Sequence, residues 1–419
     1  MTVAVTTIGE ASGDLLPLEI VERKGLGHPD TICDHLTEAL SQELSRSYRE
    51  IYGHTLHYNV DKALLWGGSS DPRFGGGRIS QPMEVYLAGR AIVDAAGRHL
   101  PLDDLVKEVV RRWFARYFPL LDLDRHLRTH CLVRPGSADL ASLFERHGDG
   151  APAMANDTSI GVGFAPLSSL ERVVLDAEHR LGEMACGDIP AIGRDIKIMG
   201  IRQGRKARIV VACALVDRHI PDLQAYLSTK ADIAEIVRSV ACAEDLDADV
   251  LVNTADDPDA GSLYLTVLGT SAECGDDGQA GRGNRINGLI TPFRPTTIES
   301  VPGKNAVSHV GKLYNIAAGL IADRVARLDG VAEAQCLLVS EIGHPVTEPL
   351  TVNVRLRLSD AGNVKDYQAA VSAIVEQELE LLAGTDLALA NGSVAIGNWP
   401  LRRADSDPLS SRNTPHRNS

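Results

Sequence analysis

Aromatic residues make up only 4% of this chain of 419 residues. Aliphatic side chains must therefore fill most of the core. The length is sufficient for two or three modest domains, or for one large fold with a sizeable core. No apolar run approaches the roughly 18 residues that a membrane-spanning helix needs, which excludes such a span. The N-terminal residues lack a basic region followed by an apolar one, so we expect no secretory signal and a cytoplasmic protein.

The seven cysteines are scattered without a CxxC pair, which argues against a disulfide framework or a zinc site. We expect them to be single buried thiols in a reducing cytosol. Acidic residues outnumber basic ones, 56 to 42, and the formal net charge is −14. Non-specific binding of nucleic acid needs a basic surface, so this net charge argues against it. A small phosphate ligand needs only a local cluster of cations, so this charge still allows one.

Apolar residues at helical spacing predict several helices. The strongest pattern runs from His28 to Tyr52, with Pro29 and Asp30 suited to the first turn and Gly53 to the end. A Ser168–Glu171 capping box predicts the start of another helix. Further helices are expected over 102–117, 221–243, 308–328 and 363–382, and strands over 209–216, 250–253, 263–268 and 350–356. The irregular alternation of these elements indicates an α+β fold with layered sheets.

Two stretches in the first half of the chain combine glycines with side chains suited to binding. In Glu22–Asp30, which reads ERKGLGHPD, glycines let the backbone approach a ligand, and a helix N-terminus offers N–H groups to an anion. His28 could supply a proton or a charge there, and Asp30 could hold a hard cation. A glycine turn with a capping aspartate is the simpler interpretation. Ala155–Gly163 is suited to bind a base, a ribose or an amino acid, or else forms an Asx-turn before a strand.

Two later stretches are also rich in glycine or charge. Residues 269–288 hold two aspartates and two arginines among glycines, namely Asp276, Asp277, Arg282 and Arg285. A linker would be richer in serine, so a binding loop is the favoured interpretation. Residues 302–312 place three cations at an expected helix start, Lys304, His309 and Lys312, which favours an anion there. Neither a Walker A loop nor a Rossmann fingerprint occurs in the sequence, so phosphates are expected to bind in another way.

Taken together and in this order, these stretches resemble the archaeal-type S-adenosylmethionine synthetases. The resemblance extends from about Val21 to about Asn398. It rests on the blocks VERKGLGHPD, NVDK with WGG, DPRFGGG, ANDTSIGVGFAPLS, IGRDIKIMG, VNTADDP, GTSAECGDDGQAGRGNR with NGLITP, and GKNAVSHVGK with YNI.

The resemblance implies an enzyme that joins ATP to L-methionine by attack of sulfur on C5′ and then hydrolyses the triphosphate to phosphate and diphosphate. It further implies Mg²⁺ and K⁺ as cofactors, and a homodimer whose active site is built from both subunits. The implied fold has three similar layered sheet-plus-helix domains with pseudo-threefold symmetry and helices outside the sheets. We place these interleaved domains at about 1–145, 146–300 and 301–402. The composition of 403–419 is that of a disordered tail.

The resemblance also implies roles for individual residues. The histidine and the aspartate of the family's GHPD motif act on the leaving group and on the metal, which assigns these roles to His28 and Asp30. The other implied roles are polyphosphate-binding catalytic cations at Lys197, Arg282 and Lys304, ATP binding at Asp276, methionine binding at Asp157 and His309, and a monovalent cation beside Asp61.

A further segment departs from the family pattern. The family's phosphate-facing run usually reads GQGSVD, and the corresponding residues are assigned here to ATP binding. They are Arg134, Pro135, Gly136, Ser137, Ala138 and Asp139. The first two differ from the family's, so backbone contacts at these two positions do not follow from the resemblance. A carboxylate for a second magnesium ion is not apparent near Gly311 in the sequence.

Two other functions remain as alternatives. An ATP-dependent kinase or ligase would need a hydroxyl or carboxylate acceptor and would release ADP or AMP. A decayed paralogue would bind ATP or S-adenosylmethionine as a sensor, although His28, Asp30 and Lys304 are all retained. Displacing triphosphate requires the stabilisation of about four negative charges, so preorganised cations should supply most of the acceleration.

Overall fold

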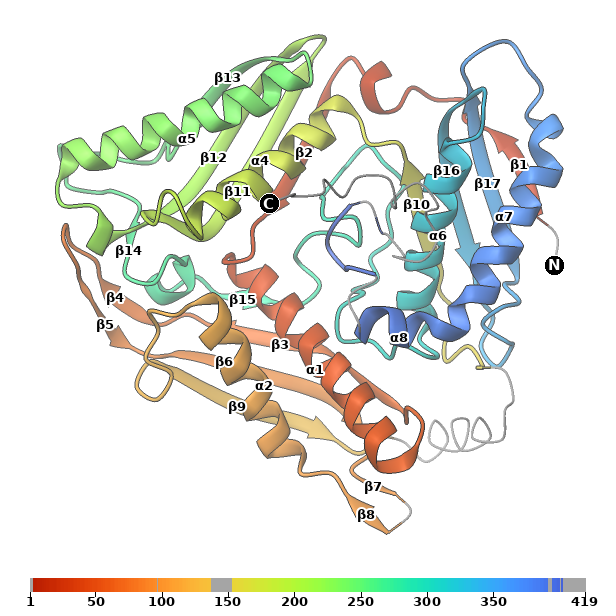
Figure 1. Cartoon of the computed structure of the whole chain (residues 1–419), viewed down its shortest axis with the longest axis horizontal. Coiled ribbons are helices and arrows are strands. Elements are labelled where there is room, and N and C mark those ends of the chain that lie inside the picture. Colours follow the sequence, from red (N-terminus) through yellow and green to blue (C-terminus); the bar gives the residue numbers. More distant parts are fainter. Residues whose placement is uncertain (1–2, 96, 137–152, 391–393, 400, 402–419) are drawn as a thin grey trace, which may run out of the picture.

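The computed structural model describes residues 3–95, 97–136, 153–390, 394–399 and 401. These residues form three main sheets, each with two helices packed on one face (Figure 1). The α+β class predicted from the sequence is confirmed. Among the helices of these residues, none is long and apolar enough to cross a membrane.

The first sheet, with strand order β15-β3-β6-β9, is covered by α1 and α2. Leu36, Leu40 and Leu44 recur every fourth residue of α1 and are fully buried against this sheet. The helix ends at Gly53, whose φ of 84° is readily adopted only by glycine. The bounds are α1 Pro29–Tyr52, β3 Tyr58–Trp66, β6 Met83–Ala91, α2 Leu102–Tyr117, β9 Leu127–Arg134 and β15 Gly278–Gln279, with the hairpin strands β4 Ser69–Asp71, β5 Arg78–Gln81, β7 Asp94–Ala95 and β8 Arg98–His99.

The second sheet has the order β13-β12-β11-β2, with β14 beside β12, and is covered by α4 and α5. The predicted capping box is confirmed, because Ser168 and Glu171 each bond to the other's backbone N–H at the start of α4. The bounds are β2 Glu19–Lys24, α4 Ser169–Ala185, β11 Ile192–Gln203, β12 Lys206–Val216, α5 Leu223–Ala243, β13 Asp247–Val252 and β14 Leu265–Thr266.

The third sheet has the order β1-β17-β16-β10 and is covered by α6 and α7. A Cβ at Gly161 or Gly163 of β10 would lie 2.2 or 2.3 Å from the backbone of α6, so both glycines allow this helix to approach the strand closely. The bounds are β1 Val3–Thr7, β10 Ile160–Ala165, α6 Val310–Ala326, β16 Val331–Val339, β17 Thr351–Leu358, α7 Gln368–Glu380 and α8 Thr385–Ala390.

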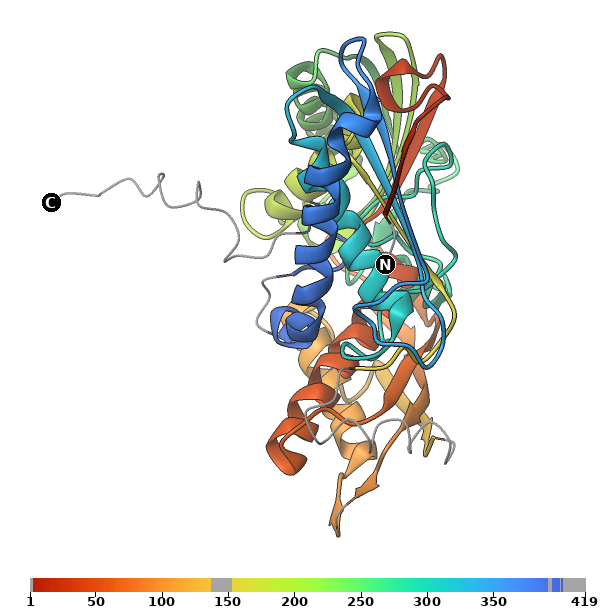
Figure 2. The same cartoon turned by 90° about the vertical axis from the view of Figure 1, so that its right-hand side faces the viewer.

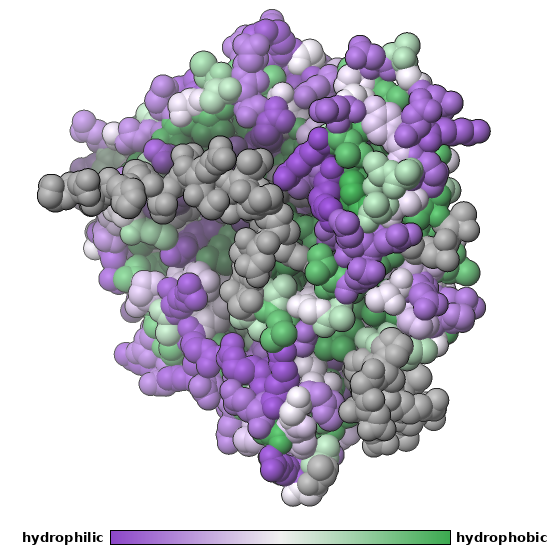
Figure 3. Space-filling view, turned by 45° about the vertical axis from the view of Figure 1, so that its right-hand side comes forward, coloured by the Kyte–Doolittle hydropathy of each residue, from purple (hydrophilic) through white to green (hydrophobic). Residues whose placement is uncertain are grey.

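The helices lie on one side of the molecule and the sheets on the other (Figure 2). Seen obliquely, the helix side presents a mainly hydrophilic surface with smaller hydrophobic areas (Figure 3). The sheet faces that point away from the helices carry apolar side chains. On β3, for example, Ala63 and Leu65 are buried, whereas the alternating Leu64 and Trp66 are 46% and 56% exposed.

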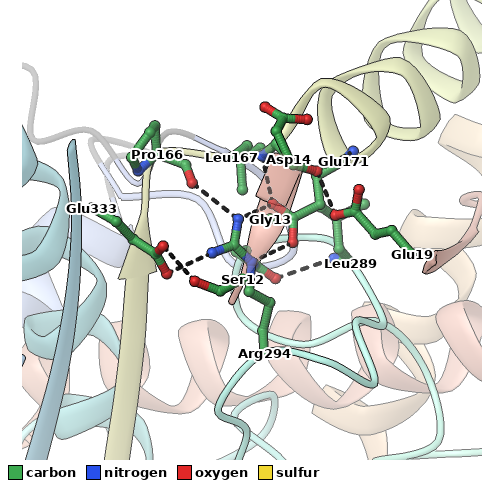
Figure 4. A network of polar contacts seen from close by, with 12 residues as sticks. Ser12, Gly13, Asp14, Glu19, Pro166, Leu167, Glu171, Leu289, Arg294 and Glu333 are labelled. Carbon is green, nitrogen blue, oxygen red and sulfur yellow. Dashed lines mark hydrogen bonds and ion pairs between the residues drawn. The ribbon is translucent and has the colours of Figure 1, made fainter. Parts of the chain in front are cut away.

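Each sheet with its two helices is called a unit below. A buried network of charges joins the second unit to the third (Figure 4). The guanidinium of Arg294 donates to both carboxylate oxygens of Glu171 at 2.8 Å and to Glu333 at 2.9 Å. Glu171 belongs to α4 of the second unit and Glu333 to β16 of the third. The Arg294 side chain is only 3% exposed, so the network fixes two units against each other from within.

Two expectations about the fold need correction. The expected strand over 263–268 is wrong in most of its length, because only Leu265–Thr266 pair, and they do so with the last two residues of β12. All seven cysteines are free thiols, as predicted, but burial is wrong for three of them, since Cys186, Cys242 and Cys274 are exposed.

Candidate active site

His28 is held at the N-terminus of α1 by a tight backbone packing. The N–H of Gly27 donates to the carbonyl of Arg194 (2.8 Å), and a Cβ at Gly27 would lie 2.4 Å from that residue's backbone. Nδ1 of His28 accepts from the N–H of Asp30 (3.2 Å), which places the proton of a neutral ring on Nε2. Burial, assisted by the charge of Lys24, lowers the pKa of His28 to about 4. At neutral pH this side chain therefore offers an N–H donor and carries no charge.

Lys24 connects the parts of the site around His28. Its Nζ lies 2.9 Å from Oδ2 of Asp30 and also donates to the carbonyl of Arg282 (2.9 Å). On the neighbouring strand β11, Lys197 pairs in register with Lys24, and its Nζ lies 3.4 Å from the carboxylate of Glu22. The structure thus brings the predicted residues together at one end of β2 and α1.

The loop after β14 contributes Asp276 and Arg282 to the same region. Asp276 lies close enough to His28 for its charge to oppose the lowering of the histidine pKa. The side chain of Arg282 is exposed, while its carbonyl is fixed by Lys24. An exposed guanidinium on a fixed backbone is suited to bind an anionic ligand.

A second group of predicted residues surrounds Lys304. Its Nζ lies 2.8 Å from Oδ2 of Asp61 and 3.2 Å from Oε2 of Glu299, and its side chain is 7% exposed. The other oxygen of Asp61 accepts from Lys62 at 2.5 Å. Two carboxylates therefore neutralise Lys304, and ammonium groups contact both oxygens of Asp61.

The residues assigned to methionine lie on this second side as well. His309 caps α6 by accepting from the N–H of Gly311 (3.2 Å), and burial together with Lys304 lowers its pKa to about 3. The side chain of Asn156 accepts from the N–H of Val310 (3.4 Å), which brings the exposed Asp157 next to the start of this helix. His309 is therefore neutral, contrary to the expected cation.

The expected cation at Lys312 is enclosed. Its Nζ pairs with Glu38 at 2.7 Å, and its side chain has no exposed surface. Lys312 therefore cannot contact a ligand at the helix start. Of the three expected cations, only Lys304 remains there, and two carboxylates neutralise its charge.

The assigned ATP-binding segment is only partly visible. Arg134 ends β9, and the carbonyl of Pro135 accepts from Arg90 (3.2 Å). A Cβ at Gly136 would lie 3.3 Å from the ring of His57. Ser137, Ala138 and Asp139 lie outside the described residues.

The two groups lie apart along strand β3. The loop of Arg282 pairs through β15 with Leu64 and Leu65, whereas Lys304 pairs with Asn59. At the rise of an extended strand this interval corresponds to roughly 16 Å. The two segments approach each other more closely at Gly281, where a Cβ would lie 3.1 Å from the side chain of Ser300, the neighbour of Glu299.

The role of Glu299 was not predicted. A Cβ at Gly311 would lie 2.7 Å from its carboxylate, which also accepts from the hydroxyl of Ser159. The structure thus places a carboxylate near Gly311, where none was apparent. It comes from a loop twelve residues earlier in the chain, and local sequence carries no signal for such an approach.

A cleft of about 610 Å³ opens between α1 and α4 behind this region. Its lining includes Asp34 and His35 of α1 and His179 of α4, together with Lys24 and Asn284. The cleft therefore borders the back of the Arg282 loop.

Metal ligands are few in this region. No group of three or more histidine, cysteine or acidic side chains with metal-binding geometry occurs in the part of the chain that the structure describes. Asp30 is a single, largely buried carboxylate beside His28, and its oxygens accept from Lys24 and from the N–H of Gln279. A single carboxylate suits magnesium, which takes few protein carboxylates and keeps water and phosphate oxygens as its other ligands.

Comparison with known proteins identifies the family. The family model for S-adenosylmethionine synthetase (AdoMet synthetase) matches residues 1–393. The chain belongs to the S-adenosylmethionine synthetase family. This confirms the resemblance predicted from the sequence, and the activity is that of a methionine adenosyltransferase.

Individual relatives agree with this membership. The chain is 47% identical over 382 residues to a probable S-adenosylmethionine synthase of Aquifex aeolicus, covering 90% of this chain and 95% of the relative. It is 44% identical over 390 residues to the S-adenosylmethionine synthase of Hyperthermus butylicus, with the same coverage. An unusual S-adenosylmethionine synthetase from Campylobacter jejuni shares the fold with a TM-score of 0.58 at 14% identity, covering 88% of this chain and 90% of that one.

Proposed function

We propose that the chain forms S-adenosylmethionine from ATP and L-methionine and then hydrolyses the bound triphosphate to phosphate and diphosphate. The observation that carries the details is the arrangement at the start of α1. The groups that meet there are the neutral imidazole of His28, the carboxylate of Asp30 and the ammonium of Lys197. The exposed Arg282 lies beside them.

In the first step the sulfur of methionine attacks C5′ of ATP. The C5′–O bond breaks, and triphosphate leaves with the bonding electron pair while a sulfonium forms. His28 donates its Nε2–H to the departing oxygen, and Lys197 and Arg282 balance the charge of the outer phosphates. The thioether carries no proton, so no general base is required. In the second step, positioning and charge stabilisation by the same cations promote attack of water on the triphosphate.

The other assigned residues complete this proposal. Asp276 and the segment 134–139 contact ATP, and Asp157 and His309 contact methionine. Lys304 acts at the polyphosphate as part of its cluster with Asp61 and Glu299. Magnesium held by Asp30 would neutralise phosphate charge when bound. Potassium is proposed from the family resemblance alone. The contacts of Asp61 do not support it, because ammonium groups already contact both of its carboxylate oxygens.

We further propose that the three sheet units are domains related by pseudo-threefold symmetry in a cytoplasmic enzyme. Each unit has a sheet of four or five strands with two helices on one face, which supports this arrangement. The approximate ranges 1–145, 146–300 and 301–402 remain our division of the chain. Some strands cross it, since β1 and β2 are consecutive in the chain but belong to different sheets.

A homodimer is part of the same proposal. The open sheet faces expose Leu64, Trp66 and Leu132, on β3 and β9 of one sheet. Exposed apolar patches of this kind typically mark interaction surfaces. A second copy of the chain would cover them and could bring Lys304 of one subunit to His28 of the other.

Subunit complementation tests the shared site. Chains with His28→Ala and chains with Lys304→Ala are each expected to be inactive. Random exchange makes half of the dimers mixed, and each mixed dimer has one intact site of two if the residues meet across the interface. An equal mixture should therefore regain about a quarter of the wild-type rate. No recovery despite verified exchange, or a fully active monomer in analytical ultracentrifugation, would contradict the shared site.

The activity itself is tested by product stoichiometry. Purified protein with ATP, L-methionine, Mg²⁺ and K⁺ should form S-adenosylmethionine with one phosphate and one diphosphate per turnover. Omitting methionine should abolish release of both. Stoichiometric ADP or AMP would instead indicate the kinase or ligase alternative.

A further inference from the structure

Three carboxylates on α1 hold the segments that carry the catalytic cations. Asp30, Asp34 and Glu38 are four residues apart, so they follow one another along one face of the helix. They accept hydrogen bonds from the backbone N–H groups of Gln279 (2.9 Å), Gly281 (2.8 Å) and Gly303 (3.1 Å), respectively. The first two bonds fix the loop of Arg282. The third fixes Gly303, the residue directly before Lys304.

Asp34 controls the backbone on both sides of Arg282. One of its oxygens accepts from the N–H of Gly281, and the other would lie 2.2 Å from a Cβ at Gly283. Arg285 donates to the carbonyls of the same two glycines at 2.8 Å. The backbone around Arg282 is thus held by both its donors and its acceptors.

We infer that Asp34 is a positioning residue, which holds the Arg282 loop in the conformation that binds triphosphate. The inference rests on the proposed function for its kinetic consequences, while the contacts themselves do not depend on it. Among the residues that the structure describes, the Asp34 side chain hydrogen-bonds to the loop backbone, so it acts through Arg282 and has no direct role in the chemistry.

The environment of Asp34 supports a role beyond stability. Burial raises its pKa to about 7, and Asp30 contributes in the same direction, whereas Arg285 and Lys24 oppose the shift. A carboxylate whose ionisation costs free energy is a poor choice for packing alone. Its presence here fits a requirement for a hydrogen-bond acceptor at this position.

Two variants of Asp34 separate the hydrogen bond from the rest of the side chain. Asp34→Ala removes the acceptor, and we expect hydrolysis of added tripolyphosphate to slow about tenfold with little change in the KM for methionine. Asp34→Asn keeps an oxygen that can accept from Gly281 and should recover most of the rate. Glu50→Ala, at an exposed position near the other end of α1, is the matched control and should behave as wild type.

Limited trypsin digestion gives a readout that does not require activity. Cleavage after the exposed Arg282 should be faster in Asp34→Ala than in wild type, Asp34→Asn or Glu50→Ala. If the wild type made no S-adenosylmethionine, but Asp34→Ala was still cleaved faster than the other three proteins, the positioning role would stand and the proposed function would fail.

Other outcomes would overturn the positioning role. One is equal loss of rate in Asp34→Asn and Asp34→Ala. Another is unchanged hydrolysis and digestion in Asp34→Ala. A third is a parallel loss of both reaction steps that follows the melting temperature.

Discussion

Replacing His28 by asparagine is expected to slow S-adenosylmethionine formation by about 10²–10³-fold, or about 3–4 kcal/mol in the barrier. The imidazole Nε2–H is the donor that we assign to the departing C5′ oxygen, and the shorter asparagine cannot reach the same point. Asparagine is a favourable N-cap, so α1 should keep its first turn and the protein its stability. Hydrolysis of added tripolyphosphate should remain comparatively intact, because the outer phosphates contact other cations.

Arg282→Leu is the reciprocal variant, in which hydrolysis should suffer more and bound triphosphate should accumulate after one turnover. Rapid-quench single-turnover assays measure both steps, with melting temperatures as the control. Equal losses in both steps for both variants would reject this division of roles.

The pH dependence gives an independent check on His28. Its folded pKa of about 4 lies below the usual 6.5 of histidine, so the neutral form persists until the pH approaches 4. As the pH falls through 6.5, the rate of S-adenosylmethionine formation by the wild type should therefore not decrease through protonation of His28. A loss with an apparent pKa near 6.5 that disappears in His28→Asn would contradict a neutral donor.

Helices were predicted from the sequence with more success than strands, for a physical reason. The start of α1 and the capping box of α4 depend on residues within one turn of each other, so local sequence determines them. Strand pairing is not local. β1, for instance, pairs with β17, almost the whole chain away, and β14 ends after two residues because its partner β12 ends there.

The site shows the same division between local and distant signals. The GHPD motif predicted the histidine at a helix N-terminus correctly, because the motif and the cap are one local feature. The charge state of His309 and the enclosure of Lys312 depend on Glu38, Lys304 and burial by distant segments. The spacing of Asp30, Asp34 and Glu38 is visible in the sequence, but nothing there indicates which N–H groups they accept from.

The largest loss of stability is expected for Arg294→Met. It leaves the carboxylate of Glu171 buried without its ion-pair partner, whereas Glu333 keeps Arg357, and breaking a buried pair in this way costs about 3–5 kcal/mol. That is a large share of the roughly 5–15 kcal/mol that stabilises a typical folded protein. Unfolding in guanidinium chloride should show a clearly lower midpoint concentration of denaturant for Arg294→Met than for the wild type. Arg208→Met is the matched control, because its pair with Asp249 is exposed and worth about 0–1 kcal/mol.

A triple variant distinguishes unpaired charge from lost packing. Combining Arg294→Met with Glu171→Gln and Glu333→Gln removes both buried carboxylate charges. Arg357 loses its partner Glu333 but is partly exposed, so most of the stability lost in the single variant should return. An Arg294→Met protein that unfolds at the wild-type midpoint would show that the network does not hold the units together. A triple variant no more stable than the single one would instead assign the loss to packing, including the contact of the guanidinium with the Phe164 ring at 4.7 Å.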